Sequence, residues 1–576
     1  MATTEPLERA APALADPLDR AADARDAERV EAVIGGGEPI AGRLDALRIL
    51  DGMLDMLEPR AVAGESLAMA AELVRIALGR SAVELPPRDK RFADPAWAEN
   101  PLYHRWAQAY LAWVETVDRL STTPRLKADW KREARARFSA ALLTSTIAPT
   151  NLLAGNPAAL KRAFDTGGLS LLRGARNLFR DVRENGGMPS QVDASGYVLG
   201  ESLAATPGAV IHREEMFELL EYATATPEVG SRPLLMIPPQ VNKYYFLDLA
   251  PGRSFVEYLV GRGVHFFTVV WRNPREEHGH WGLEDYVEAQ RRALEVVRDV
   301  SGSDEVNLLG ACAGGLTSAL MLGHMAATGE EDGITSATFC ISMIDSRHPN
   351  ALTVMTTDRM QRTLARDARD RKVYDRKELA RTFAWMRPND LVFNYLANNW
   401  LMGNDPPAFD ILAWNNDGTN LPARFDRDML DIYAHNRAAE PGGVEVLGTP
   451  VDLGQVDVDS FVIAGLTDHI TPWMPCYMTS QLLGGRSEVV ITSTGHIQTM
   501  VNPPGKPRAR YFAGPEPGPD PEAWMEAATT VEGSWWPRYA DWLLERSGES
   551  REAPSRPGNR RFKPIEPAPG QYVREA

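Results

Sequence analysis

Apolar residues recur at helical spacing through the first third of the chain. Leucines occupy every third or fourth position from Leu44 to Leu57, and the stretches 103–120 and 126–143 repeat this spacing. Prolines separate the stretches, at Pro86, Pro87, Pro95, Pro101, Pro124 and Pro149. The pattern predicts a helical N-terminal domain over residues 38–195, and no catalytic constellation is visible within it.

The pattern changes to short apolar runs that alternate with amphipathic stretches from about residue 196. The runs predict buried strands at 234–237, 265–271, 306–309, 337–343, 461–464 and 489–492. Residues 254–261 and 283–300 predict helices, and Gly302 marks the end of the second. Strands that alternate with helices imply a mostly parallel sheet covered on both faces. We therefore predict an α/β catalytic domain over residues 196–576.

Three segments depart from these two patterns. Residues 346–440 are rich in charge and aromatic side chains, which predicts an insertion over the sheet. Residues 548–576 are rich in Pro, Arg and Glu and predict an extended tail. Residues 1–37 are rich in Ala, Asp, Glu and Arg and lack the apolar centre of a secretory signal, so we expect a flexible leader.

Composition narrows the classes of function. The net charge of −16 argues against a nucleic-acid partner for this chain of 576 residues. No window reaches the ~18–20 uninterrupted apolar residues of a membrane span, so we expect no transmembrane segment. The three cysteines form neither a C-x-x-C pair nor a disulfide framework. Together these features predict a cytoplasmic protein.

One stretch, Glu276-Glu277-His278-Gly279-His280, resembles a metal-binding cluster in composition. Its spacing fits no usual zinc pattern, and a solvated loop is the better interpretation. We predict no metal site.

The strongest chemical signal is Gly310-Ala311-Cys312-Ala313-Gly314, a nucleophile-elbow pattern with cysteine in the place of serine. It follows the predicted strand 306–309 and precedes a stretch, 316–322, that predicts a helix. This strand–turn–helix context is the one that the motif requires. Glycine fits two residues before and after the nucleophile because it has no Cβ. The motif predicts that Cys312 is a nucleophile.

A cysteine nucleophile needs a base, since a thiol with the ordinary pKa of about 8.5 is only a few per cent ionised at neutral pH. His496 follows the predicted strand 489–492, and Asp468 follows 461–464. The order Cys312, Asp468, His496 is that of an α/β-hydrolase triad. The alternatives are that Asp468 only caps a helix and that His496 is structural. For His469, next to Asp468, we expect an orienting role.

An oxyanion hole needs two preorganised donors. The backbone N–H of Ala313, directly after the nucleophile, is predicted as one. The loop after the first strand of the domain should supply the other, and its two prolines have no N–H. Gln240 and Val241 both remain candidates for this second donor.

The use of cysteine also points to a substrate. A thiolate that attacks a thioester forms another thioester, so the acyl group stays activated for a second transfer. Serine would give a more stable oxoester, which suits hydrolysis. The choice therefore favours acyl transfer from a thioester such as acyl-CoA.

Longer motifs resemble those of one family, the polyhydroxyalkanoate synthases. The matching stretches extend from about residue 90 to the C-terminus and comprise 238–245, 271–274, 307–315, 386–391, 414–417, 468–473, 495–498 and 534–536. The resemblance implies an α/β-hydrolase fold with a cap, preceded by a helical N-terminal domain. It implies that Cys312 is the nucleophile that holds the growing polyester chain and that His496 is the base that activates Cys312. Asp468 is then the acid of the triad, or else it helps to activate the hydroxyl of the incoming monomer.

The resemblance also implies an activity and its partners. The substrate is (R)-3-hydroxyacyl-CoA, the product is a polyester, and no cofactor is needed. The enzyme is expected to be a homodimer at the surface of polyester granules. The long chain with its own N-terminal domain resembles the single-subunit (class I or II) synthases. The stretches 310–312 and 383–388 resemble the medium-chain-length group, whereas 346–350 and 424–428 depart from the commonest cap pattern.

Two rival functions remain open. The first is a cysteine-dependent α/β-hydrolase, either a thioesterase or a depolymerase. The second, from a different class, is a granule-coating protein without catalytic activity.

Overall fold

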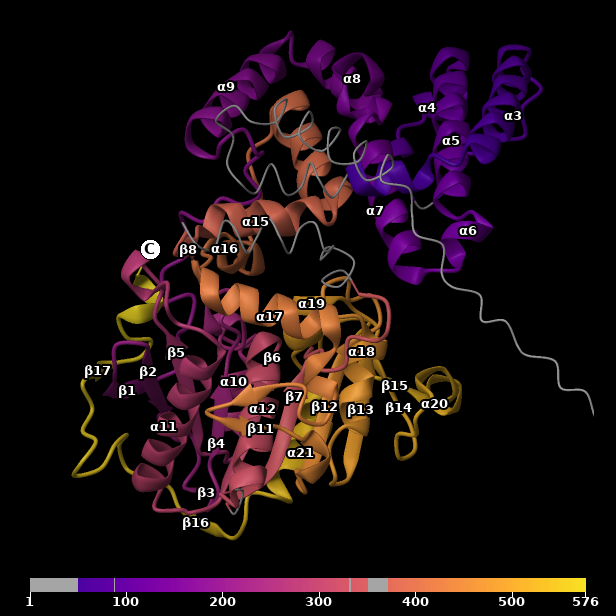
Figure 1. The fold of residues 1–576 in the computed structure, drawn as a ribbon. Coiled ribbons are helices and arrows are strands. Elements are labelled where there is room, and N and C mark those ends of the chain that lie inside the picture. The colour runs from indigo at the N-terminus through magenta and orange to yellow at the C-terminus, as the bar shows by residue number, and fades with distance from the viewer. Residues whose placement is uncertain (1–49, 88, 331–332, 351–370, 576) are drawn as a thin grey trace, which may run out of the picture.

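The computed structural model describes residues 50–87, 89–330, 333–350 and 371–575. The predicted leader lies outside these residues, as does part of the predicted insertion. Figure 1 shows a group of helices from the start of the chain beside a large sheet built from the later residues. The change between them falls after Glu184, where the last of these helices ends, and before Gly208, where the first strand begins. The exact domain boundary stays a prediction.

Three helices of the N-terminal part begin where a polar side chain accepts from their first free N–H groups. Asn100 caps α5, Asp129 caps α7 and Asn156 caps α8. Two small apolar clusters pack the helices together, one around Trp97 and one around Val117. The helices are α3 (Pro59–Ala77), α4 (Ala96–Glu99), α5 (Pro101–Ser121), α6 (Pro124–Lys127), α7 (Trp130–Thr146), α8 (Pro157–Asp165) and α9 (Leu169–Glu184).

Eleven strands of the described residues form one sheet, in the order β15-β14-β13-β12-β7-β6-β4-β5-β2-β1-β17. The central strands from β13 to β5 are parallel to their neighbours, and both outer groups are antiparallel. The α/β prediction is therefore confirmed. The central strands are β4 (Leu234–Ile237), β5 (Phe266–Trp271), β6 (Val306–Ala311), β7 (Ile334–Cys340), β12 (Asp459–Gly465) and β13 (Ser487–Thr492). The outer strands are β1 (Gly208–Arg213), β2 (Phe217–Tyr222), β14 (Arg510–Ala513), β15 (Thr529–Glu532) and β17 (Glu566–Pro567).

Two details of the predicted strands are wrong. The strand that precedes the Gln240 loop is β4, and β1, β2 and β3 (Glu228–Gly230) come before it in the chain, so it is not the first of the domain. The strand predicted at 337–343 begins earlier and ends at Cys340, because the chain turns at Ile341, whose φ is 46°. Apolar side chains continue past this turn, which is why the pattern extended the strand too far.

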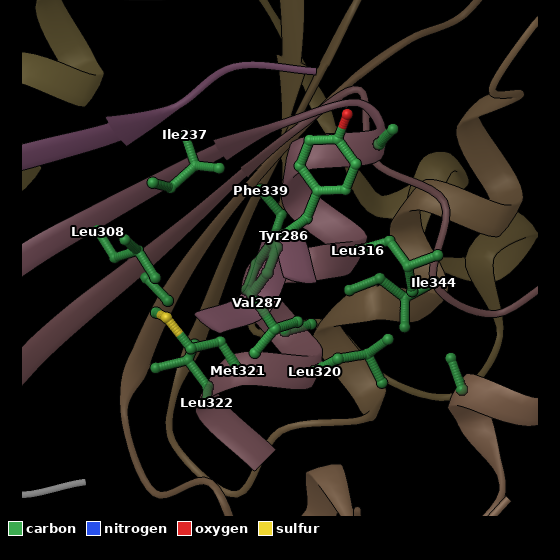
Figure 2. Packing of buried hydrophobic residues seen from close by; sticks show 14 of the residues in the cluster. Ile237, Tyr286, Val287, Leu308, Leu316, Leu320, Met321, Leu322, Phe339 and Ile344 are labelled. Carbon is green, nitrogen blue, oxygen red and sulfur yellow. The ribbon is translucent and has the colours of Figure 1, made fainter. Parts of the chain in front are cut away.

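Helices cover both faces of the sheet, and each face has its own core. Helices α11 (Leu283–Ser301) and α12 (Ala313–Thr328) cover one face, where Leu308 and Phe339 pack with Leu320 and Val287 (Figure 2). Helices α10 (Phe255–Val260) and α21 (Trp536–Leu544) cover the other. Burial of this apolar surface, at ~25 cal/mol per Å², is the main term that stabilises the fold.

The described part of the predicted insertion forms helices that lie over one end of the sheet, the end at which β6, β12 and β13 finish (Figure 1). They are α15 (Arg376–Trp385), α16 (Asp410–Asn416) and α17 (Ala423–His435), with wider helical turns at Asn389–Phe393 and Leu396–Leu401 and a short pair of strands, β8 (Val373–Tyr374) and β9 (Leu421–Pro422). We call residues 371–440 the cap.

The C-terminal residues run mostly as extended chain along the sheet domain. There β16 (Ser550–Glu552) pairs with β3, and β17 pairs with β1.

The remaining elements are β10 (Glu445–Val446), β11 (Thr449–Pro450), α18 (Trp473–Met478), α19 (His496–Met500) and α20 (Pro521–Ala527). None of the helices that the structure describes has the length and apolar character to span a bilayer.

Candidate active site

Cys312 occupies a sharp turn between β6 and α12. Its backbone has φ 50° and ψ −121°, a conformation that residues with a Cβ rarely adopt. The turn is fixed by hydrogen bonds on both sides: the Cys312 N–H donates to the Cys340 carbonyl at 2.9 Å, and the Gly315 N–H donates to the Cys312 carbonyl at 3.0 Å. The turn is the strand-to-helix elbow that the sequence motif predicts, and Cys312 itself is half-buried.

The glycines of the motif are required by close backbone packing. A Cβ on Gly310 would lie 2.6 Å from the Cα of Gly315. A Cβ on Gly314 would lie 2.4 Å from the Ile237 carbonyl oxygen and 2.5 Å from that of Pro238. All three distances are below any real van der Waals contact. The start of α12 therefore presses directly on the end of β4 and its loop.

Asp468 lies in the loop after β12, and its side chain is buried. It accepts hydrogen bonds from the Ile470 N–H at 2.9 Å and the Thr471 N–H at 3.0 Å. Its Oδ2 lies 2.7 Å from Nδ1 of His496, the first residue of α19. It does not cap the following helix, because the N-cap of α18 is Pro472.

A third side chain, that of Thr471, contacts both members of this pair, and the sequence did not predict it. The Thr471 hydroxyl lies 3.0 Å from Asp468 Oδ2, to which it donates, and 3.1 Å from His496 Nδ1. A threonine three residues after a candidate acid is too common a pattern to have identified it. Two groups therefore occupy the Nδ1 side of the imidazole, and the Cys312 side chain acts on the same ring, because it helps to raise the pKa of His496.

The electrostatics of the pair follow from its burial and its charges. Burial alone would lower the pKa of His496, but the charge and hydrogen bond of Asp468, together with the Cys312 side chain, raise it from its ordinary 6.5 to about 10. Burial acts to raise the pKa of Asp468, and the charge and hydrogen bond of His496, helped by the Thr471 and Ile470 N–H groups, lower it overall. The arrangement favours a carboxylate beside an imidazolium, and that state suits a sulfur that must lose its proton.

The two predicted sources of oxyanion donors lie beside the Cys312 turn. Ala313 is the first residue of α12, so its N–H is one of those that have no acceptor within the helix. In the loop after β4, the Asn242 N–H donates to Thr419 Oγ1 at 3.0 Å, whereas the N–H groups of Gln240 and Val241 make no hydrogen bond within the described part of the chain. Both stay candidates.

The structure also places His469, the two other cysteines and the stretch 276–280. His469 makes no hydrogen bond to Asp468 or His496 in the described part of the chain, and burial lowers its pKa to about 4, so its orienting role stays a prediction. The thiols of Cys340 and Cys476 are buried, which raises the pKa of each. The interpretation of 276–280 as a solvated loop is wrong for His278, which is buried and stacks on Trp281 with ring centres 4.2 Å apart. Over the described residues, no cluster of His, Cys, Asp and Glu could hold a metal ion.

Two family models match the chain. One, described as "Poly-beta-hydroxybutyrate polymerase (PhaC) N-terminus", matches residues 88–259. The other, described as "alpha/beta hydrolase fold", matches residues 247–503, which include Cys312, Asp468 and His496. The predicted α/β-hydrolase fold is confirmed.

Curated relatives resemble the chain over nearly its whole length. Poly(3-hydroxyalkanoate) polymerase 2 of Ectopseudomonas oleovorans is 45% identical over 89% of this chain and 91% of its own. The Poly(3-hydroxyalkanoate) polymerase subunit PhaC of Cupriavidus necator is 38% identical over 87% of this chain and 85% of its own. The Poly(3-hydroxyalkanoate) polymerase of Methylorubrum extorquens is 36% identical over 90% of this chain and 86% of its own.

Proposed function

Because the chain belongs to the poly(3-hydroxyalkanoate) polymerase family, a class of acyltransferases, we propose that it joins (R)-3-hydroxyacyl-CoA units into a polyester through a thioester on Cys312. The observation that carries this proposal is the hydrogen bond of 2.7 Å between Asp468 and His496, at the sheet edge where Cys312 occupies the elbow turn before α12. A cysteine in this position keeps the acyl group activated, as elongation requires.

In the first half-reaction the Cys312 sulfur attacks the thioester carbonyl of the acyl-CoA. His496 Nε2 holds the proton that the thiol has given up, and Asp468 stabilises this imidazolium. The negative charge on the carbonyl oxygen is stabilised by the Ala313 N–H and by the N–H of Val241 or Gln240. The C–S bond to CoA then breaks, and the leaving thiolate takes up the proton that His496 holds.

In the second half-reaction a hydroxyl, from a monomer or from a chain end, attacks the Cys312 thioester. His496 removes the hydroxyl proton and returns it to the Cys312 sulfur when that bond breaks, unless Asp468 assists the hydroxyl directly. One ester bond forms for each thioester consumed. The chemistry needs no cofactor other than the acyl-CoA substrate.

We propose further that the enzyme works at the surface of its insoluble product, with α9 as a contact. This helix is amphipathic, but its polar face is buried and its apolar face is exposed. Its polar residues Ser170, Asn177 and Asp181 are buried, and the last two bond to the cap: Asn177 donates to the Asn399 carbonyl at 3.1 Å, and Asp181 accepts from Trp400 Nε1 at 2.7 Å.

The outward face of α9 is apolar and cationic. Leu172 is 69% exposed and Phe179 is 70% exposed. Exposed arginines accompany them, at Arg173, Arg176 and Arg183. A helix with this composition binds at the boundary between an apolar phase and water. A polyester chain held on Cys312 would keep that phase within reach. The homodimer and the cytoplasmic location remain predictions from the sequence.

The test of the proposed function is the fate of the acyl group. Purified enzyme supplied with (R)-3-hydroxyacyl-CoA should release CoA and form polymer that sediments, and Cys312→Ala should stop both. Free hydroxy acid without polymer would favour a thioesterase or depolymerase instead. Unchanged CoA release by Cys312→Ala would favour neither enzyme, because both depend on the cysteine.

A further inference from the structure

The loop that carries the second oxyanion donor is held by the cap as well as by the core. On the core side, Gln240 Nε2 donates to Thr317 Oγ1 of α12 at 3.1 Å. On the cap side, the Asn242 N–H donates to Thr419 Oγ1 at 3.0 Å, and Trp414 Nε1 donates to the Lys243 carbonyl at 2.8 Å. Val241 therefore lies between one anchor in the core and two in the cap.

The backbone of this loop needs such support. Asn242 has φ 71°, in the left-handed region that a residue with a side chain enters only at a cost. Asparagine tolerates this region better than most residues. The left-handed conformation of Asn242 still needs contacts from outside the loop to hold it. Since Asn242 directly follows Val241, the direction of the Val241 N–H depends on whether Asn242 keeps its left-handed conformation.

An ion pair with one buried partner, Lys243, fixes the next residue. Lys243 is 5% exposed, and its Nζ donates to Asp417 Oδ1 at 2.7 Å and to the Val573 carbonyl at 2.6 Å. The other Asp417 oxygen accepts from the Tyr245 hydroxyl at 2.9 Å. A buried charge that loses its partner is strongly unfavourable, so this pair holds the cap segment and the loop together.

We propose that Asp417 and Thr419 are positioning residues for acyl transfer: from the cap, they hold the loop so that the Val241 N–H meets the developing oxyanion. The inference rests on the proposed function, in which this loop completes the oxyanion hole. It makes the cap part of the catalytic geometry, because removing these contacts would release the loop while leaving Cys312, Asp468 and His496 in place.

The test compares two reactions of the same sulfur in the full-length chain. Acylation of Cys312 by a chromogenic thioester or p-nitrophenyl ester needs an oxyanion hole, whereas alkylation by iodoacetamide forms no oxyanion. Thr419→Val and Asp417→Asn should each slow acylation about 10- to 100-fold, the range expected when a donor is misplaced or lost. The alkylation rate should stay within about twofold of wild type, since the Asp468–His496 pair is untouched.

Matched variants separate positioning from general damage. Thr419→Ser keeps the hydroxyl and should restore most of the acylation rate, and Thr144→Val, in helix α7, should change neither reaction. Equal loss of acylation and alkylation in Thr419→Val would overturn the inference, as would acylation at the wild-type rate. A wild-type chain that is never acylated would contradict the proposed function itself, whereas acylated wild type with unaffected variants would contradict only the role of the cap.

Discussion

Asp468 and His496 are joined by a hydrogen bond of 2.7 Å although 28 residues separate them in the chain. The sheet explains this contact. Asp468 follows β12 and His496 follows β13, and these strands are parallel neighbours whose carboxyl ends meet at the same edge. Cys312 follows β6 at that edge, with β7 between β6 and β12. The strand order therefore places Cys312, Asp468 and His496 at one edge of the sheet.

The first prediction concerns stability and pH. The pKa of His496 is raised from 6.5 to about 10, so the contribution of the pair to the free energy of unfolding is complete below pH 6.5 and is lost as the pH rises to about 10. At the acid end, the lowered pKa of Asp468 means that the contribution present above pH 3.8 is lost as the pH falls through the folded-state value. Urea unfolding of wild type and Asp468→Asn should therefore differ most between about pH 4 and 6.5. A difference that stays constant up to pH 10 would contradict the assigned pair.

The second prediction concerns Thr471, whose hydroxyl contacts both Asp468 and His496. A hydrogen bond to a charged group contributes about 1.5–3 kcal/mol, so Thr471→Val should lower kcat about 10- to 100-fold. Thr471→Ser keeps the hydroxyl and should retain most of the activity. Steady-state CoA release measures both variants, and equal activity of the valine and serine variants would show that the hydroxyl is unimportant.

The third prediction concerns the glycine that follows the nucleophile. Gly314→Ala would place a Cβ against two backbone carbonyls, neither of which can rotate away, and should destabilise the domain by about 1–3 kcal/mol or prevent folding. Gly64→Ala is the matched control, because a Cβ at this position of α3 would meet nothing within 4 Å. Thermal unfolding of the two variants measures the difference. Similar melting temperatures would contradict the close packing of α12 on the β4 loop.

The fourth prediction concerns the outward face of α9. Replacing Leu172 and Phe179 by Glu leaves the buried polar face of the helix intact, so the fold and the early rate of CoA release should not change. The fraction of enzyme that sediments with polymer should fall severalfold, because two apolar contacts become charges. Leu67→Glu, at an equally exposed position of α3, is the control. An unchanged sedimenting fraction in the α9 variant would remove this helix from the contact.

The sequence predicted the triad because each member follows an apolar run and the chain order fits. It could not predict Thr471, because a threonine three residues after an acid is too common a pattern. It could not predict the contacts of the cap with the Asn242 loop either, since these join residues that no local pattern relates. The oxyanion loop was likewise predicted from its position after a strand, but the sequence could not choose between Gln240 and Val241, and the N–H groups of both make no hydrogen bond within the described residues.

The sequence did not predict the strands β1 and β2, for a related reason. Glu218 and Glu221 are both buried in β2, where a half-buried strand pattern would place apolar residues. Their partners lie far along the chain: Glu218 accepts from the Tyr572 N–H at 3.0 Å, and Glu221 accepts from the Gly558 N–H at 2.6 Å. A buried carboxylate that the C-terminal tail satisfies cannot be recognised from its own neighbourhood.

The central claim is that the Cys312 sulfur carries the acyl group during turnover. The direct measurement is mass spectrometry of peptides from enzyme quenched within one turnover of (R)-3-hydroxyacyl-CoA. We predict that the peptide containing Cys312 gains the mass of one or more hydroxyacyl units, that hydroxylamine removes them, and that peptides with Cys340 and Cys476 gain nothing. Polymer formation with Cys312 unmodified throughout, or with the acyl group on another residue, would contradict the account.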